Sequence, residues 1–542
     1  MKQFFIILML FLSLHLTAQT KYWVSFKDKN TTTFKLSNPK EFLSENALER
    51  RLKYNIPITI SDLPVCISYL NTVQNIGVEI GKSSKWLNGT IIYTENEALI
   101  SQIENLAFVL NVKKISFEGN SNPRNKFEVE ENNFSLKSSQ ELDYAASKNQ
   151  IEMLKGNYLH NLGFTGGDIE IAVMDNGFPS VDTNSFYANA NFEGRIIPVY
   201  NFVNNNDSLF ISSNGNHGSS VISTMASFKE GKLVGTAPNA KYYLFITEDN
   251  ANEGLAEEYN WAMAAEMADS ILGVRAIIST SLGYSDGFNN AADNHVYADM
   301  DGNTTPITIA ADLAASKGIL VVASAGNEGN KDWRYISAPS DGDSVLCIGA
   351  VQPDGTLAGF SSVGPSADNR LKPNVCAQGN PAAGITVNEV VTSINGTSFS
   401  CPIISGMAAC LWQANPDKSN MEIFYAIEKS AHLYDTPNND YGYGIPNFEK
   451  AFDILADVII QDFLIYTNPV EDKLEFYLPK NLQEQSFILT VTDISGAVFI
   501  NKSFPAKYIS GLISIPNNLS KGVFYLVLSN SNIKYKSKFV KL

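Results

Sequence analysis

The sequence predicts a three-part protein in which a central α/β domain follows an α+β domain and precedes a small all-β sandwich. In the middle of the chain, apolar strand-like segments alternate with helical patterns, which is typical of a parallel sheet with helices on both faces. Upstream the pattern runs β-α-β-β-α-β, and downstream short strands are separated by turn residues. A chain of 542 residues is also too long for a single core.

The chain opens with an apolar leader. A positively charged residue precedes an apolar run over 4–14, and Leu16-Thr17-Ala18-Gln19 has the small residues of a cleavage site. This pattern predicts a secretory signal peptide over 1–18, removed after Ala18. No later stretch has the roughly 18 consecutive apolar residues of a spanning helix, so we expect no transmembrane anchor.

The segment 19–118 is predicted to be an α+β domain. We expect its strands over 21–27, 78–80, 85–93 and 109–117, and its helices over 39–53 and 96–106. This order is that of the split βαβ, or ferredoxin-like, sandwich, which supports many functions. A linker over 119–148, rich in Asn, Ser and Glu, follows and offers a site for proteolytic cleavage.

The central domain is predicted over 149–456. We expect strands over 169–174, 241–246, 274–280, 319–323 and 344–350, and helices over 255–271, 308–316, 421–430 and 448–455. Domains of this kind place their chemistry at the carboxyl ends of the strands, where the crevice of the sheet opens.

One serine lies at the start of a buried helix in this domain. Ser398 follows a Gly-Thr turn and precedes apolar residues at helical spacing, from Ile403 to Trp412. A helix N-terminus presents unpaired N–H groups and the positive end of a dipole, which favours an oxyanion beside Ser398. The alternative is a simple N-cap serine, so a catalytic role requires a base and an acid from elsewhere.

A base and an acid are both found upstream. Of the five histidines, His217 alone opens a distinctive run, His217-Gly218-Ser219-Ser220, which leads into a helix. Asp175 ends an apolar strand, where a parallel sheet opens its crevice. The order aspartate, histidine, serine along the chain is one in which catalytic triads occur.

These residues carry a family resemblance. Gly396-Thr397-Ser398-Phe399-Ser400-Cys401-Pro402 resembles the nucleophile signature of the subtilisin-like serine peptidases, and His217-Gly218-Ser219 resembles their histidine signature. Val173-Met174-Asp175-Asn176-Gly177 resembles their aspartate signature, and Ala323-Ser324-Ala325-Gly326-Asn327 their oxyanion-hole segment. Asn176 departs from the family, which usually has a small hydroxyl residue or alanine there, and we expect it to bear on the hydrogen-bond shell of the aspartate.

The resemblance implies a subtilisin-like fold and a secreted serine endopeptidase, with Asp175, His217 and Ser398 as the triad and Asn327 as an oxyanion donor. In front of such a domain, the 19–118 region resembles the family's propeptide, an intramolecular chaperone and inhibitor. The resemblance also implies a cleft for protein or peptide substrates between two walls, which are Ser281, Leu282 and Gly283 on one side and Ala323, Ser324, Ala325 and Gly326 on the other. The first wall resembles the family's strand that pairs with the backbone of an extended substrate.

Two other functions compete with this interpretation. Gly283-Tyr284-Ser285-Asp286-Gly287 matches the G-x-S-x-G elbow of esterases, with Ser285 as nucleophile, but the residues after it form a poor helix pattern. A subtilisin-like fold that binds or adheres without cleaving is the second alternative. The net charge of −16 disfavours nucleic acid as a partner.

A polar insertion over 284–306 directly follows the first wall and is expected to overhang the unprimed subsites, which bind the residues before the scissile bond, and so to influence substrate choice. Within it, Asp299-Met300-Asp301-Gly302-Asn303 offers oxygen ligands for Ca²⁺, although the complete EF-hand pattern is absent and a solvated acidic turn is the alternative. The triad mechanism itself needs no cofactor. The five cysteines have no framework spacing, which argues against disulfides, and Cys401 is interpreted as a small buried apolar side chain.

The C-terminal module is predicted over 463–542, with strands over 474–477, 487–493, 498–504, 512–515, 523–529 and 534–541. It has nine Lys and five acidic residues, a net charge of +4, whereas the rest of the chain carries about −20. Four short motifs, beginning at Tyr466, Val491, Leu519 and Lys538, resemble the C-terminal sorting domain of the type IX secretion system, although Thr467 stands where that family usually has proline.

This second resemblance implies that the type IX machinery recognises the module and carries the protein through the periplasm to the cell surface or the medium. A stabilising or carbohydrate-binding appendage is the alternative for the same module.

Overall fold

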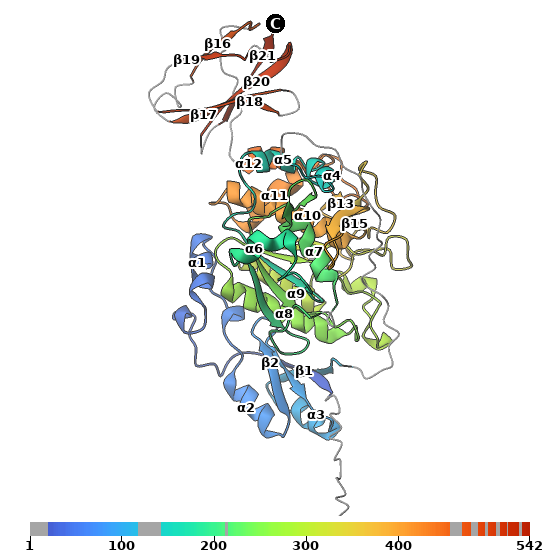
Figure 1. The fold of residues 1–542 in the computed structure, drawn as a ribbon. Coiled ribbons are helices and arrows are strands. Elements are labelled where there is room, and N and C mark those ends of the chain that lie inside the picture. Colours follow the sequence, from blue (N-terminus) through green and yellow to red (C-terminus); the bar gives the residue numbers. More distant parts are fainter. Residues whose placement is uncertain are drawn as a thin grey trace, which may run out of the picture.

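The computed structural model describes residues 20–116, 142–211, 215–455, 469–478, 486–493, 497–505, 510–516, 519–530 and 534–542, and Figure 1 shows their arrangement. The predicted signal peptide and most of the predicted 119–148 linker lie outside these residues.

The centre of the protein is a seven-stranded parallel sheet. Its order is β13-β12-β11-β10-β5-β9-β6, and each neighbouring pair is parallel. The strands are β5 (Glu170–Asp175), β6 (Ile196–Asn201), β9 (Lys241–Ile246), β10 (Ala276–Thr280), β11 (Ile319–Ser324), β12 (Val345–Val351) and β13 (Val375–Gln378). The predicted α/β class is confirmed, and the two edge strands β6 and β13 are additions to the strands that the sequence indicated.

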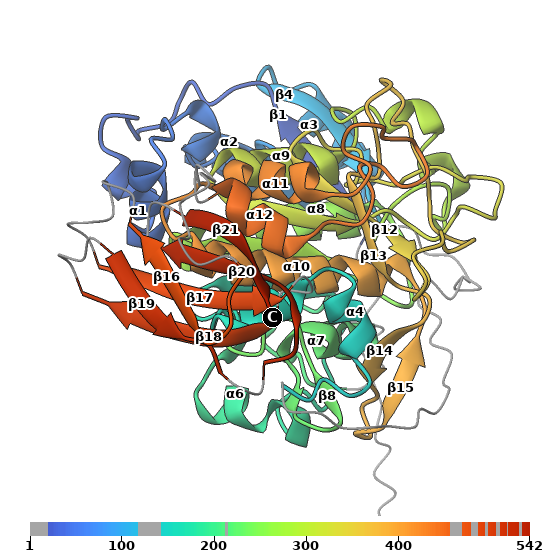
Figure 2. The same ribbon diagram turned by 90° about the horizontal axis from the view of Figure 1, so that it is seen from above.

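Helices cover both faces of this sheet (Figure 2). One face packs against α8 (Leu255–Ile271) and α9 (Pro306–Ser316) through Met174 and Ile278. The other face packs through Ile171 and Val173 against helices that include α7 (His217–Ala226), α10 (Thr397–Ala414), α11 (Asn420–Ser430) and α12 (Phe448–Leu455). Alternate residues of β5 thus enter opposite cores, which is why this strand is apolar along its length.

Short elements complete the central domain. These are the helices α4 (Lys148–Glu152), α5 (Gly156–Asn161) and α6 (Ala188–Phe192), and two antiparallel pairs, β7 (Phe228–Lys229) with β8 (Leu233–Val234) and β14 (Ala382–Ile385) with β15 (Val391–Ile394).

The N-terminal unit is a four-stranded antiparallel sheet of order β2-β3-β1-β4, which is the order of the ferredoxin-like sandwich. Its strands are β1 (Lys21–Phe26), β2 (Glu79–Ser84), β3 (Gly89–Tyr93) and β4 (Val109–Lys114). Two helices, α2 (Ile67–Asn75) and α3 (Glu97–Glu104), form a core with one face of the sheet, and this core contains Val24, Val73, Ile92 and Ile103.

The helix predicted over 39–53 has a different place from the one that its order implied. It forms α1 (Glu45–Lys53), but it contacts α8 of the central domain, and the first crossover of the N-terminal sheet is α2, which the sequence pattern did not indicate. The reason is chemical: the buried face of α1 carries Arg50 and Arg51, and these charges are matched by Asp269 of α8.

The N-terminal unit and the central domain share a hydrophobic core. Trp23 of β1 stacks on Tyr259 of α8 with ring centroids 4.4 Å apart, and Trp86 and Ile91 lie in the same cluster. This cluster uses the sheet face opposite to the one that α2 and α3 cover, because neighbouring residues of a strand point to opposite sides.

A buried arginine joins the same two parts. The Arg50 guanidinium, whose side chain is 0% exposed, lies 2.7 Å from Asp269 Oδ1. It also donates to the carbonyl oxygens of Leu272 at 2.8 Å and Gly273 at 2.7 Å, beyond the end of α8, and of Lys317 at 3.1 Å, at the end of α9. Arg50 therefore caps two helices of the central domain from a residue of the N-terminal unit.

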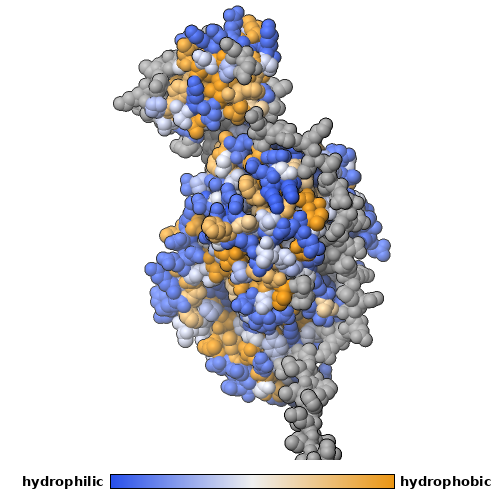
Figure 3. All heavy atoms as spheres, in the orientation of Figure 1, coloured by the Kyte–Doolittle hydropathy of each residue, from blue (hydrophilic) through white to orange (hydrophobic). Residues whose placement is uncertain are grey.

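The C-terminal module contains two antiparallel sheets around one core, as the all-β prediction requires. β16 (Lys473–Tyr477) pairs with β19 (Ser510–Ser514), and the second sheet has the order β18-β17-β20-β21, with β17 (Phe487–Asp493), β18 (Val498–Phe504), β20 (Gly522–Ser529) and β21 (Lys534–Lys541). On the face that Figure 3 shows, hydrophobic side chains are prominent on this module. Its exposed large apolar side chains include Ile488, Phe499 and Leu512.

All five cysteines lie in the described residues as free, buried thiols. Burial raises the pKa of the four thiols in the central domain, at Cys347, Cys376, Cys401 and Cys410. Among the helices of the described ranges, none has the length and hydropathy needed to cross a membrane.

Candidate active site

Three strand ends meet at one edge of the central sheet. Asp175 is the last residue of β5, Ser281 directly follows β10, and Ser324 is the last residue of β11. Because these strands are parallel neighbours, their carboxyl ends lie together, at the edge where α/β enzymes bind ligands. The N-termini of α7 and α10 bring His217 and Ser398 to the same region.

Asp175 and His217 are hydrogen-bonded. His217 Nδ1 lies 2.8 Å from Asp175 Oδ1 and 3.0 Å from Oδ2, and both side chains are buried. A carboxylate accepts hydrogen bonds and does not donate them, so Nδ1 carries the proton of the neutral imidazole and Nε2 is the basic nitrogen. This arrangement orients a potential proton acceptor.

Asn176 holds the start of α7. Its Oδ1 accepts hydrogen bonds from the backbone N–H groups of His217 at 3.1 Å and Gly218 at 3.4 Å, and its Nδ2 donates to Asn250 Oδ1 at 2.9 Å. We expected this residue to bear on the aspartate, but its backbone N–H contacts the Asp175 carboxylate while its side chain caps the helix that carries the histidine.

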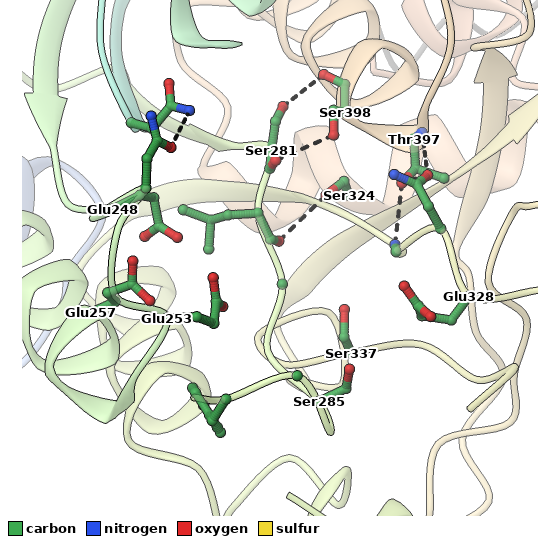
Figure 4. Close-up of a pocket in the computed structure, with 18 of the residues that line it drawn as sticks. Glu248, Glu253, Glu257, Ser281, Ser285, Ser324, Glu328, Ser337, Thr397 and Ser398 are labelled. Carbon is green, nitrogen blue, oxygen red and sulfur yellow. Dashed lines mark hydrogen bonds between the residues drawn. The ribbon is translucent and has the colours of Figure 1, made fainter. Parts of the chain in front are cut away.

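Ser398 is clamped to the segment after β10. Pro402 lies four residues further along α10 and has no N–H, so the Ser398 carbonyl lacks its usual helical donor. Ser281 Oγ donates to that carbonyl at 2.8 Å, and Ser398 Oγ donates to the Ser281 carbonyl at 3.3 Å (Figure 4). The next residue of α10 is Phe399, and the centroids of its ring and of the His217 ring are 5.7 Å apart.

Asn327 is oriented by α10. Its Oδ1 accepts hydrogen bonds from the Thr397 backbone N–H at 2.9 Å and from Thr397 Oγ1 at 3.0 Å. A backbone N–H can only donate, so this contact fixes the amide oxygen toward the helix and turns Nδ2 away from it. Asn327 and Ser398 line the same cavity, so the amide can act on a group bound there.

A cavity of about 540 Å³ opens beside Ser398. Of the predicted walls, it is lined by Ser281, Leu282, Gly283, Ser324 and Gly326. The other two residues of the predicted walls, Ala323 and Ala325, are fully buried in hydrophobic clusters, since alternate residues of β11 and its extension face away from the cavity.

Ser337 lines the cavity as well, and no sequence motif marked it. It lies against both walls, because a Cβ added to Gly326 would come within 3.1 Å of Ser337 Oγ and one added to Gly283 would come closer still. Gly326 also has a φ of +107°, which side-chain-bearing residues rarely adopt. Glycine at these two positions therefore keeps the pocket open.

The cavity is acidic. Six of its lining residues carry carboxylates, which are Glu248, Asp249, Glu253, Glu257, Asp286 and Glu328. In the part of the chain that the structure describes, Lys331 is the single cation in this lining, and its Nζ lies 3.0 Å from Glu328 Oε1. A concave site with an excess of one charge focuses a field of that sign on its ligand.

The esterase elbow has no structural support in the described residues. Ser285 lines the cavity, but two short 3-10 turns, Ala291–Asp293 and Tyr297–Asp299, follow it where an elbow needs a helix. His295 Nε2 lies 2.8 Å from Glu258 Oε1, which gives this histidine a buried structural contact.

The carboxylates of the candidate calcium turn are used locally. Asp301 accepts hydrogen bonds from the Asn303 backbone N–H at 2.8 Å and from Thr304 Oγ1 at 3.0 Å, and Asp299 accepts one from the Val296 N–H at 2.9 Å. Within the described ranges, no group of three His, Cys, Asp or Glu side chains is placed to hold a metal ion. Calcium binding at this turn stays a prediction.

The chain is similar to known proteins along most of its length. Residues 166–444 match the model of the subtilase family, peptidase S8, and residues 21–133 match the model of the peptidase S8 propeptide domain of Bacteroidota. Subtilisin NAT of Bacillus subtilis subsp. natto is 27% identical over 325 residues, which are 60% of this chain and 74% of that protein. Subtilisin of Bacillus pumilus is 27% identical over 303 residues, which are 56% of this chain and 97% of that protein.

A solved structure shares the fold. The epidermin leader peptide processing serine protease of Staphylococcus aureus matches with a TM-score of 0.53 and 14% identity, over 80% of this chain and 98% of that chain. Since the subtilase model covers more than half of the 542 residues, this chain belongs to the subtilase family and is a subtilisin-like serine peptidase preceded by a propeptide domain of that family.

Proposed function

We propose that the protein is a secreted serine endopeptidase that uses Asp175, His217 and Ser398 as its catalytic triad and is made as a self-inhibited precursor. The observation that carries this proposal is the contact of His217 Nδ1 with the Asp175 carboxylate at 2.8 Å, in a helix that packs against the helix of Ser398. A triad needs a histidine fixed in this tautomer beside a serine at a cavity.

The mechanism follows from these positions. The Ser398 hydroxyl turns from the Ser281 carbonyl toward His217 Nε2, which takes its proton as Oγ attacks the scissile carbonyl. Asp175 stabilises the imidazolium that forms, and His217 then gives the proton to the leaving amine. Water then takes the place of the leaving amine. His217 accepts a proton from water as the water attacks the acyl-enzyme, and it gives this proton to Ser398 Oγ as the acid product leaves.

The oxyanion of the tetrahedral intermediate is stabilised by two donors in this proposal. One is Asn327 Nδ2, which is turned away from α10 by the contacts of its oxygen with Thr397. The other is the Ser398 backbone N–H at the start of α10, where the helix dipole adds to the effect.

An active-site label tests the assignment. A fluorophosphonate should modify the mature enzyme at Ser398, and Ser398→Ala should lower kcat by about 10⁶, the magnitude known for subtilisin itself. Labelling at Ser285 would favour the esterase alternative, and a protein that neither labels nor cleaves would be a binding or adhesion scaffold.

The precursor is proposed to process itself. The propeptide domain shares a core with α8, and the predicted 119–148 linker joins it in sequence to the peptidase domain. Purified Ser398→Ala precursor should keep residues 19–118 attached, while the wild type loses them. Equal processing of the two in a purified system would show that another protease performs the cleavage.

We propose further that the C-terminal module directs export through the type IX secretion system. The support is the motif resemblance and the all-β fold of the module; residues 466–468 of the first motif and 494–496 of the second lie outside the described residues. Deleting 463–542 should strand a folded, active enzyme in the periplasm. Wild-type levels of the truncated enzyme at the cell surface or in the medium would favour the appendage alternative.

A further inference from the structure

The segment from Ser281 to Gly283 divides the cavity into two halves (Figure 4). Ser324, Ser337 and Glu328 lie on one side of it. On the other side, Glu248, Glu253 and Glu257 turn their carboxylates toward a common space. We call this second half the glutamate pocket.

Two of these glutamates are held rigidly. Glu248 Oε1 accepts hydrogen bonds from the Tyr284 hydroxyl at 2.6 Å and from Thr247 Oγ1 at 3.1 Å, and its residue is only 2% exposed. Glu257 accepts hydrogen bonds from the backbone N–H groups of Asp249 at 2.7 Å and Gly254 at 3.1 Å. Side chains fixed in this way present their charge at a defined place, without the entropy cost of ordering a flexible group.

The three charges act on one space. Burial raises the pKa of Tyr284 well above its ordinary value, and the negative charges of Glu248, Glu257 and Glu253 add to the effect. Lys331, the one cation among the described residues that line the cavity, is bound to Glu328 in the other half. Among its described residues, the glutamate pocket therefore supplies three carboxylates and no cation to a ligand that enters it.

The backbone of Gly283, on the wall of the cavity, indicates the kind of ligand that binds beside the glutamate pocket. Within the described residues, the N–H and C=O groups of Gly283 have no hydrogen-bond partner, while the next residue, Tyr284, pairs with Ala338. Unpaired backbone groups along the wall of a cavity favour an extended peptide, which pairs with them as an added strand. A peptide on this wall carries its side chains past Leu282 into the flanking pockets.

We propose that the glutamate pocket selects substrates with a lysine or arginine upstream of the scissile bond. This inference rests on the proposed endopeptidase function, because the wall from Ser281 to Gly283 is the one expected to pair with the residues before that bond. The pocket offers a long cationic side chain three carboxylates around its charged end and the apolar Leu282 beside its methylene stem.

The test uses the mature wild-type enzyme and three sets of fluorogenic peptides. The sets share one scissile pair and place lysine, norleucine or glutamate at the second, third or fourth residue before it. Norleucine matches the length of the lysine stem and lacks its charge. We expect lysine to exceed norleucine in kcat/KM by about tenfold or more at one or more of these positions, since one charge-assisted contact is worth about that factor. Glutamate should be the poorest of the three.

Variants of Glu253 assign the effect to the pocket. Glu253 is the most exposed of the three glutamates, so its replacement disturbs the fold least. Glu253→Gln should lower the ratio of lysine to norleucine, and Glu253→Lys should bring it below 1. Asp182→Asn is the matched control, because it also removes one negative charge while Asp182 is exposed and lies outside the cavity lining. The ratio of lysine to norleucine cleavage by this variant should equal that of the wild type.

Two results would overturn this proposal, and neither touches the function beneath it. One is equal cleavage of the lysine and norleucine peptides at all three positions. The other is a lysine preference that persists unchanged in both Glu253 variants. Loss of all peptide cleavage by the wild type, in contrast, would refute the proposed endopeptidase function itself.

Discussion

The link between the propeptide domain and the peptidase domain can be weakened at one residue. Arg50→Ala removes a guanidinium that is 0% exposed and that contacts the Asp269 carboxylate and carbonyl groups at the ends of α8 and α9. The ion pair between Arg50 and Asp269 is lost, while the separate ion pair of Asp269 with Arg51 at 2.9 Å remains. The carbonyl groups, however, lose the hydrogen bonds that they accepted from Arg50, and a cavity is left where its side chain had been.

The cost of this change follows from the burial of the pair. Removing one partner of a buried ion pair typically destabilises a protein by about 3–5 kcal/mol. With a urea dependence of about 2 kcal/mol per molar, the midpoint at which the two domains separate should fall by about 1.5–2.5 M. Lys53→Ala on the same helix is the control, because Lys53 pairs at 3.5 Å with an Asp417 side chain that is 96% exposed, and such pairs contribute about 1 kcal/mol or less.

The assay uses precursors that carry Ser398→Ala, which blocks the proposed self-processing. Trp23 and Trp86 lie in the core that the two domains share, which makes tryptophan fluorescence a reporter of their separation in urea. If the midpoint shift for Arg50→Ala is no larger than that for Lys53→Ala, Arg50 is not a strong polar link between the domains.

Three further predictions concern the site and the same interface. Asn327→Asp keeps the oxygen that Thr397 contacts but lacks the amide donor. Both this variant and Asn327→Ala should lose about 10²–10³ in kcat with little change in KM, which is the loss known for the equivalent residue of subtilisin. A tenfold or smaller loss would remove Asn327 from the oxyanion hole. Ser281→Ala leaves the Ser398 carbonyl without its 2.8 Å donor and should lower kcat more than KM rises in steady-state kinetics; unchanged kcat would contradict the clamp. The urea midpoint of the precursor should also depend on pH in two directions. Burial would raise the pKa of Asp269, but the contacts with arginines hold it at about 2 against an ordinary 3.8, so its contribution is complete above about pH 4 and is lost as the pH falls toward 2. Burial raises the pKa of Glu266 above 4.5, so its charge opposes docking at neutral pH and docking strengthens as the pH falls through that raised value. A midpoint that only falls from pH 7 to pH 3 would contradict this reasoning.

The sequence predicted the parts of this protein that depend on periodicity and on short motifs. The strands around Asp175 and the helix at Ser398 form as expected, because a buried parallel strand and a buried helix each have a strong local pattern. The ferredoxin-like order of the N-terminal sheet was also predictable, although its first crossover helix, Ile67–Asn75, was not, since its mixed polar and β-branched residues give a weak helical signal.

Features that depend on packing between distant segments were not visible in the sequence. Ser337 and the glutamate pocket come together only when β9, the start of α8 and the segment after β10 are placed around one cavity. The orientation of Asn176 toward α7 is of the same kind, because an asparagine after a strand can bond to the strand end or to a neighbouring helix. A motif names a residue, whereas its hydrogen-bond partners are decided by the fold.

The five buried thiols can report whether a molecule of this protein has unfolded. While the chain stays folded, its cysteines are withheld from oxidants and labels, and four of them have raised pKa values that further suppress the reactive thiolate. An unprocessed chain that unfolds exposes all five, and because five is an odd number, oxidation within one molecule leaves at least one thiol over. Disulfide-linked dimers of the precursor on a non-reducing gel are therefore expected from molecules that have unfolded under oxidising conditions and not from molecules that stayed folded.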